Sequence, residues 1–243
     1  QYAIKNDEIY VIEVNPRASR TVPFVSKAKG IPYAKIASRV MAGEKLSKFN
    51  LVSKTKKMFA VKEAVFPFNK FPNSDLLLGP EMKSTGEVMG FDKDFGMAFA
   101  KSQIAASNSL PLKGLAFISL KDSHKAEGID LAKQLLKLGF KLCATKGTAE
   151  FIRKNKIKCK TINKISSGSP NIVDVLNSKK IALVINTGGG NRKHNVSDAR
   201  EIRRATLNNK VPYCTNMSTA QTCLQAINSL KNKKLEVISL QDI

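Results

Sequence analysis

Near the start of the chain, Glu13, Asn15 and Arg17 have the residue types and spacing that bind a metal ion and phosphate. Residues two apart on a strand share a face, so the oxygens of Glu13 and Asn15 would lie side by side. If the preceding hairpin is centred on Asp7, Gln1 lies across from Glu13 and adds a third oxygen donor. One carboxylate and two amides suit a Mg²⁺ ion held largely by phosphates, with Arg17 close by to meet phosphate oxygens. Spacing alone also allows a solvated hairpin end with an Asn-Pro turn.

A second set of polar residues follows the strands expected in the C-terminal part of the chain. In an open parallel sheet, ligands bind beyond the carboxyl ends of the strands. Turns with Gly, Thr and Lys that open a helix bind phosphate, because free N–H groups and the helix dipole favour anions. Each such turn by itself is more often only a helix cap, but several at one edge of a sheet predict a phosphate site. The residues concerned are Lys125 after the first strand, 145–148 after the second, 163–164 and 166–169 after the third, and 186–191 after the fourth.

The elements that would position these residues change character near residue 109. Before it we expect a hairpin (2–5 with 9–14), a helical stretch broken by Gly-Ile-Pro (22–42), a strand (61–68), a short strand or turn (86–90) and a helix (92–107). After it, strands and helices alternate strictly, which predicts a parallel, doubly wound α/β sheet. The expected strands are 115–120, 140–144, 158–162, 181–186, 211–215 and 235–240, and the expected helices are 125–138, 149–155, 172–177, 197–208 and 219–230. The polar Pro/Gly connector 108–114 places a domain boundary between residues 108 and 109, giving domains 1–108 and 109–243.

Composition narrows the classes of function. The 243 residues carry a net charge of +22, but the lysines are spread over both halves and Trp is absent, which argues against nucleic-acid binding by base stacking. No long apolar run or signal peptide occurs, so we expect no membrane association. The four cysteines form no C-x-x-C pair and are expected to be buried free thiols, which favours a reducing, cytoplasmic location. The chain opens within a strand pattern and without Met, from which we expect a preceding N-terminal portion.

Longer motifs carry a resemblance to a known family. The run Glu-Val-Asn-Pro-Arg at 13–17 resembles the metal-binding strand of ATP-grasp ligases, and segments 19–28, 66–72 and 78–90 are similar to the second synthetase half of the carbamoyl-phosphate synthetase large chain. The resemblance implies an α+β ATP-grasp end and ATP-dependent phosphorylation of carbamate, for arginine and pyrimidine biosynthesis. It implies that Gln1, Glu13 and Asn15 bind Mg²⁺ or Mn²⁺, and ATP through the metal, with K⁺ as a further candidate ion. It also implies that Arg17 faces the transferring phosphoryl group, and that a glutaminase small chain supplies ammonia. The fragment alone, without the upstream lobe, is expected to be inactive.

The C-terminal part resembles the methylglyoxal-synthase-like regulatory domain of the same large chain. By that resemblance Glu63 and Thr215 meet an ornithine-type ligand. The resemblance also implies six residues that hold a nucleotide monophosphate: Lys125, Thr145, Thr148, Lys164, Asn186 and Thr187. Higher oligomers of the large and small chains are also implied. The chain departs from the family pattern at Gly188-Gly189-Gly190 and in a longer insertion through His194, so the identity of the effector and the retention of regulation stay open.

Two alternatives remain for the C-terminal domain. True methylglyoxal synthases share the expected fold, so a phosphate lyase is the first. Such a lyase needs a carboxylate base near the substrate, but the relevant loop has no acid before Asp174, although His194 is a candidate histidine. The second alternative is a non-catalytic interaction domain that binds phosphate or serves only a structural role.

Overall fold

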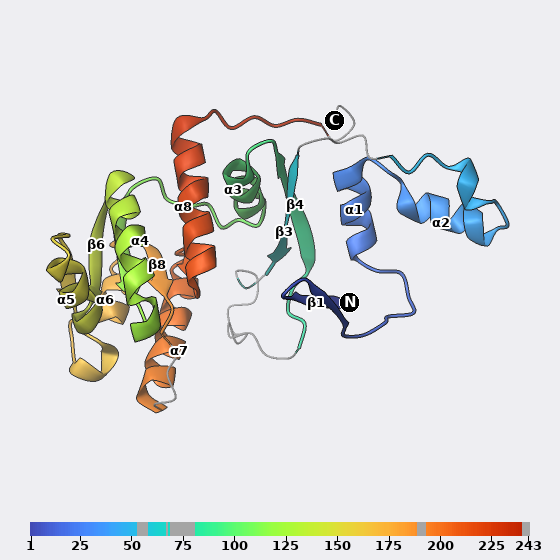
Figure 1. Ribbon diagram of the computed structural model, residues 1–243. Helices are drawn as coiled ribbons and strands as arrows, with labels where there is room; N and C mark the ends of the chain where they lie inside the picture. The colour runs from blue at the N-terminus through green and yellow to red at the C-terminus, as the bar shows by residue number, and fades with distance from the viewer. Residues whose placement is uncertain (53–57, 67, 69–80, 189–192, 240–243) are drawn as a thin grey trace. The chain divides into compact units, whose positions relative to one another are not determined.

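The computed structural model describes residues 1–52, 58–66, 68, 81–188 and 193–239, and Figure 1 shows its helices and strands. The chain divides into two compact units, Gln1–Lys57 with Val237–Ile243, and Met58–Glu236. The predicted boundary between residues 108 and 109 lies inside the second unit. It stays a prediction of where an independently folding module begins.

The first unit contains a hairpin and two short helices. Its elements are β1 (Tyr2–Lys5), β2 (Glu8–Val11), α1 (Thr21–Lys29), α2 (Tyr33–Met41) and the 3₁₀ turn η1 (Leu46–Lys48). Gly30 ends α1 in the left-handed conformation, with φ of 66°, and Pro32 precedes the first residue of α2. The predicted break in the helical stretch is therefore confirmed, because a left-handed residue and a proline both interrupt the hydrogen bonds of a helix.

The register of the β1–β2 hairpin differs from the expected one by one residue. Asn6 and Asp7 both have positive φ, 51° and 62°, as in a two-residue type I′ turn. The centre of the hairpin thus falls between them, and Lys5 pairs with Glu8. Gln1 then lies opposite Ile12, whose N–H donates to the Gln1 carbonyl at 2.9 Å. The prediction that Gln1 pairs with Glu13 is wrong for this reason.

A five-stranded parallel sheet forms the centre of the second unit, in the order β7-β6-β5-β8-β9. The alternation after residue 109 is confirmed, and the elements are β5 (Gly114–Ser119), η3 (Asp122–His124), α4 (Lys125–Lys137), β6 (Phe140–Thr145), α5 (Lys146–Lys154), β7 (Lys160–Ile162), η4 (Ile165–Ser167), α6 (Ile172–Asn177), β8 (Ile181–Asn186), α7 (Lys193–Asn208), β9 (Tyr213–Cys214) and α8 (Met217–Asn232). The three central strands β5, β6 and β8 are mostly buried and apolar, as parallel strands covered on both faces must be, whereas Lys160 and Thr161 of the edge strand β7 are exposed.

Helices cover both faces of this sheet. On one face, Ile118 and Leu142 pack with side chains of α4, α5 and α8 in the larger hydrophobic cluster. On the other face, Phe117 and Val184 pack with side chains of α6 and α7. Successive residues of β5 thus point to opposite layers, which is the doubly wound arrangement that the sequence predicts.

The second unit begins with an antiparallel pair, β3 (Phe59–Val65) and β4 (Gly86–Asp92), followed by α3 (Phe95–Ala105). Helix α3 lies against these strands and also against α8, as Figure 1 shows. The approach is close at Gly96, where an added Cβ would lie 2.6 Å from the Ser229 hydroxyl and 2.7 Å from the Gln225 carbonyl. Through α3, the β3–β4 pair is therefore joined to the helix that ends the α/β region.

Asp94 joins α3 to α8 by hydrogen bonds. Its carboxylate accepts from the Met97 N–H at 2.8 Å and so caps α3. The same carboxylate accepts from the Ser229 hydroxyl at 2.5 Å and from the Lys233 ammonium at 2.8 Å. The bonds from Lys233 and Ser229 lower the pKa of Asp94 to about 2.

Two further predictions can be compared with the structure. Residues 235–239 form no strand, and Val237 is 92% exposed, so the predicted last strand is wrong for these residues; residues 240–243 lie outside the described part. The four cysteines are free and buried, as predicted. Burial raises the pKa of Cys143 to about 12 and that of Cys159 to about 11, so both thiols stay protonated at neutral pH.

Candidate functional site at the carboxyl edge of the parallel sheet

The chain order in the sheet reverses between β5 and β8, at the centre of the sheet. The six predicted site residues follow or end strands that reach this edge, at the end of β5, β6, β7 or β8. Thr145, Thr148, Asn186 and Thr187 are all buried there. This position is the one at which open α/β sheets bind ligands.

Hydroxyl groups tie the strand ends together at this edge. The Thr148 hydroxyl accepts from the Leu120 N–H at 3.2 Å and from the Thr145 hydroxyl at 3.4 Å. The Thr187 hydroxyl accepts from the Lys121 N–H at 3.3 Å, and the Thr187 N–H donates to the Ser119 carbonyl. Both hydroxyls use an acceptor lone pair in these contacts, which leaves their own O–H available to a phosphate oxygen.

Charge gathers at the first turn of α5, which follows β6. The Lys125 ammonium lies 3.8 Å from the position that a Cβ on Gly147 would take. The carboxylate of Asp122, just after β5, is 2.7 Å from this ammonium. The hydrogen bond from Lys125 lowers the pKa of Asp122, and the more distant charge of Lys164 lowers it further. The structure thus brings Lys125 and Lys164 to the same side of the site, as the sequence predicted. The sequence did not predict that Asp122 would lie beside Lys125.

The β8 end of the site is held by a neighbouring aromatic residue. The Asn186 amide donates to the Tyr213 hydroxyl at 3.2 Å, and its oxygen accepts from the Gly188 N–H at 3.1 Å. Arg203 of α7 stands over the Tyr213 ring, 5.9 Å from its centroid. Tyr213 and Asp122 were not identified as site residues from the sequence. Asp122 could have been identified, because it follows the end of β5 at the same edge of the sheet. Of the glycine-rich departure, Gly189 and Gly190 lie outside the described residues.

The predicted metal ligands of the first unit are all exposed. Asn15 donates from its amide to the Glu13 carboxylate at 2.9 Å, so these two side chains are in contact. The main-chain nitrogen of Gln1 is 2.8 Å from the Glu13 carbonyl, which keeps Gln1 at the same end of the hairpin. Because β2 ends at Val11, the shared-face argument does not explain this contact. Two adjacent, solvent-facing oxygen-bearing groups fit a magnesium ion whose other ligands are phosphate oxygens and water.

The two residues predicted to meet an ornithine-type ligand both lie in the second unit. Glu63 on β3 is half-buried and accepts from the Gln103 amide of α3 at 2.8 Å. Burial raises the pKa of Glu63, against the effect of this hydrogen bond. Thr215 is exposed and lies two residues before α8, and among the described residues no hydrogen bond joins it to Glu63.

The acid that a lyase would need is committed to a helix cap. Asp174 accepts from the Asn171 N–H at 2.8 Å and from the Ser169 hydroxyl at 2.7 Å, and these bonds lower its pKa. The Asn171 side chain in turn accepts from the N–H groups of Val173 and Asp174, which completes a capping box. The side chain of His194 lies outside the described residues. Asp174 therefore acts as a structural residue of α6.

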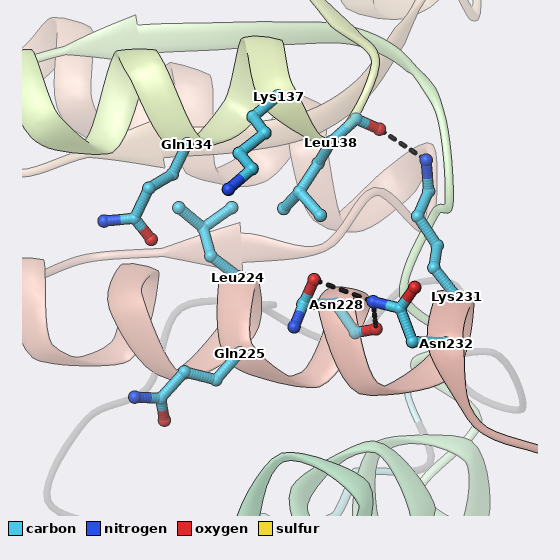
Figure 2. Close-up of a pocket in the computed structure, with 8 residues that line it drawn as sticks. All are labelled: Gln134, Lys137, Leu138, Leu224, Gln225, Asn228, Lys231 and Asn232. Carbon is cyan, nitrogen blue, oxygen red and sulfur yellow. Dashed lines mark hydrogen bonds between the residues drawn. The ribbon is translucent and has the colours of Figure 1, made fainter.

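A separate groove of about 440 Å³ runs between α4 and α8 (Figure 2). Its walls carry amide side chains such as Gln134 and Asn228 with the apolar Leu138 and Leu224. Lys231 donates to the Leu138 carbonyl and so closes one end of the groove by capping α4. None of the six predicted phosphate-site residues lines it.

Comparison with known proteins finds one family match in the N-terminal part of the chain and another in the C-terminal part. Residues 1–49 match the family described as "Carbamoyl-phosphate synthase L chain, ATP binding domain", and residues 127–215 match the "MGS-like domain". A methylglyoxal synthase from Elizabethkingia anophelis is 18% identical with a TM-score of 0.39, covering 47% of this chain and 79% of its own, and this likeness is too low to carry an argument. Among the described helices, none is long and apolar enough to cross a bilayer.

The matched regions define the class: the end of an ATP-grasp ATP-binding domain followed by a methylglyoxal-synthase-like domain. The "Carbamoyl phosphate synthase large chain, C-terminal section" of Aquifex aeolicus is 48% identical over all of this chain and 49% of its own length. Large chains from Mesorhizobium japonicum and Archaeoglobus fulgidus are 49% and 48% identical over all of this chain, and over 21% and 22% of their own length. The chain belongs to the carbamoyl phosphate synthase large-chain family and corresponds to its C-terminal section. It spans about half the length of the Aquifex relative and about a fifth of the others.

Proposed function

We propose that the chain is the C-terminal part of an enzyme that phosphorylates carbamate with ATP, and that its second unit senses a nucleotide monophosphate. The enzyme would act in the cytoplasm with a glutaminase small chain that supplies ammonia. All of this chain matches the C-terminal section of large chains from a bacterium and an archaeon, which supports this proposal. So do the exposed apolar side chains of the hairpin, such as Ile4 at 72% and Val11 at 67%, which a longer protein would cover.

In the first unit, we assign phosphate chemistry to the segment after β2. A bound Mg²⁺ or Mn²⁺ ion would neutralise charge on the transferring phosphoryl group. Glu13 supplies the carboxylate oxygen of such a site, and Asn15 is held beside it by the hydrogen bond between their side chains. Gln1, at the same end of the hairpin, would add an amide oxygen. Arg17 follows closely enough in sequence to meet phosphate oxygens with its guanidinium group.

The regulatory role rests on one observation: hydrogen bonds join the ends of β5, β6 and β8 where the strand order reverses. Thr148 and Thr187 each retain an O–H while accepting a main-chain N–H. The N-terminus of α5 adds free N–H groups and partial positive charge, and Lys125 and Lys164 offset the charge of a phosphate. The lyase alternative would use the same phosphate-binding groups, but Asp174, the acid that its loop would offer as a base, caps α6.

Calorimetric titration of uridine and inosine monophosphates against the 243-residue chain tests the proposal. Thr148→Val removes a hydroxyl and Lys164→Ala removes a charge, and each should weaken binding by about ten- to a hundredfold. Thr148→Ser keeps the hydroxyl, and Lys158→Ala removes an exposed lysine before β7, so both controls should bind like the unmutated chain. Equal affinity in all five proteins, or no binding of either nucleotide to the unmutated chain, would overturn the proposed site.

A further role is assigned to Glu63 and Thr215 as contacts for an ornithine-type ligand. A half-buried carboxylate whose pKa burial has raised gains from a cationic partner, because the cation offsets the cost of desolvation. Glu63 hydrogen-bonds to α3, and α3 packs on α8, which starts just after Thr215. The two residues therefore belong to one packed body, as a site that couples regulation to the synthetase part requires.

A further inference from the structure

Asp122 places a carboxylate beside Lys125, one of the residues of the candidate phosphate site. Asp122 lies in η3, directly after β5, and its Oδ1 atom is 2.7 Å from the Lys125 ammonium. The lysine side chain is 23% exposed, whereas that of Asp122 is 95% exposed. The exposed carboxylate therefore contacts a lysine whose side chain is largely buried, and it does so from the solvent side, where an incoming ligand can replace it.

The surroundings of this ammonium favour a stronger anion than a single carboxylate. The Lys125 Nζ atom faces Gly147 in the first turn of α5, and that turn contains no acidic residue. Free N–H groups at the start of α5 attract negative charge to the same place. Lys164 is close enough for its charge to act on Asp122. A phosphate with two negative charges would gain more from these groups than Asp122 does.

We propose that Asp122 is a built-in competitor, which holds Lys125 when no ligand is bound and sets the affinity for a phosphorylated ligand. This inference rests on the proposed nucleotide site and describes how its affinity is regulated. Ion pairs with an exposed partner are weak, so Asp122 lowers affinity without blocking the site. Removal of its charge should tighten ligand binding by about two- to fivefold.

Helix α4 offers a matched control. Asp130 pairs with Lys133 at the same spacing of three residues and at 3.9 Å, with both side chains mostly exposed. Asp122→Asn and Asp130→Asn change the net charge equally and replace the same residue type. Any general effect of charge on anion binding therefore appears in both variants, and only a local effect distinguishes them.

Titration of inorganic phosphate and uridine monophosphate against the 243-residue chain, at low ionic strength, tests the inference. Asp122→Asn should lower the Kd about two- to fivefold, whereas Asp130→Asn should leave it unchanged. Equal Kd values for the two variants, or weaker binding by Asp122→Asn, would show that Asp122 does not compete.

A second measurement separates competition from a general change in the site. In a Lys125→Met background, Asp122→Asn should no longer tighten binding, because the ammonium that both anions share is gone. An undiminished gain in that background would overturn the proposed route through Lys125. Failure of every variant to bind either probe would overturn the nucleotide site itself, and the inference with it. The same Kd for the unmutated, Asp122→Asn and Asp130→Asn chains would overturn only the role of Asp122.

Discussion

The two compact units place their functional residues in opposite surroundings. In Gln1–Lys57, Glu13, Asn15 and Arg17 are exposed, and even the apolar side chains of the hairpin are largely open to solvent. In Met58–Glu236, the four threonine and asparagine residues of the candidate site are buried at the carboxyl ends of an open sheet that helices cover on both faces. The difference teaches that the second unit organises its site with its own core, whereas the first presents its candidate ligands on an exposed hairpin end.

The largest expected effect concerns the exposed side of this comparison. In the complete protein, Glu13→Ala should reduce ATP synthesis from ADP and carbamoyl phosphate by at least about a hundredfold, because a metal ion contributes several kcal/mol to phosphoryl transfer. The melting temperature should not change, since Glu13 is exposed. Glu8→Ala on the same hairpin is the matched control and should keep its activity. Near-normal ATP synthesis by Glu13→Ala would contradict the proposed role of Glu13 as a metal ligand.

The second prediction tests how much of the chain the buried site needs. Segment 109–243 should fold alone, because it contains the parallel sheet and helices on both its faces. It should nevertheless be less stable than segment 58–236 by about 3 kcal/mol or more, since it lacks α3 and with it the fully buried Met97. Chemical denaturation of both segments measures this difference. An unfolded 109–243 segment would refute the boundary between residues 108 and 109, and equal stabilities would refute the importance of α3.

The smallest effect concerns the charge that links α3 to α8. Asp94→Asn should lower the free energy of unfolding at pH 7 by about 1–2 kcal/mol, allowing for solvent screening of the partly exposed pair with Lys233. Asp94 has a depressed folded pKa of about 2, so its stabilising effect is present above the unfolded pKa and disappears as the pH falls from about 4 towards 2. The unmutated and Asp94→Asn chains should therefore become equally stable at the acidic end of this range.

Urea denaturation at several pH values measures the effect of Asp94, with Asp130→Asn as a control for an exposed pair of 3.9 Å. The control should change stability by less than about 0.5 kcal/mol at any pH. A difference between the Asp94→Asn and unmutated chains that persisted unchanged at pH 2 would show that the lost charge is not its cause.

The sequence predicted the parts of the fold that depend on local periodicity. Ile172–Asn177 and Ile181–Asn186 begin and end at the predicted residues, because turn residues bound a strongly apolar run on both sides. It also predicted that Thr145, Thr148, Asn186 and Thr187 meet at one edge, since parallel strands place their carboxyl ends together. These successes need only the order of elements and the direction of the strands.

Other features depend on exact geometry and were not predictable in this way. The hairpin register followed from the positive φ of both Asn6 and Asp7, and a shift of one residue moved Gln1 from Glu13 to Ile12. The ion pair between Asp122 and Lys125 depends on the 3₁₀ turn between β5 and α4. The strand expected at 235–240 had the right composition, but the residues described there pair with no other strand. Amino-acid composition alone does not show whether a segment will pair with another strand.

The contact at Gly96 has a consequence for building hybrid enzymes from relatives of this chain. A residue with a Cβ there would press into the Ser229 hydroxyl and the Gln225 carbonyl, so the surfaces of α3 and α8 must be shaped for one another. A hybrid joined between residues 108 and 109 would pair an α3 from one relative with an α8 from another. A hybrid joined between Lys57 and Met58 inherits both helices from a single parent, and with them a matched interface.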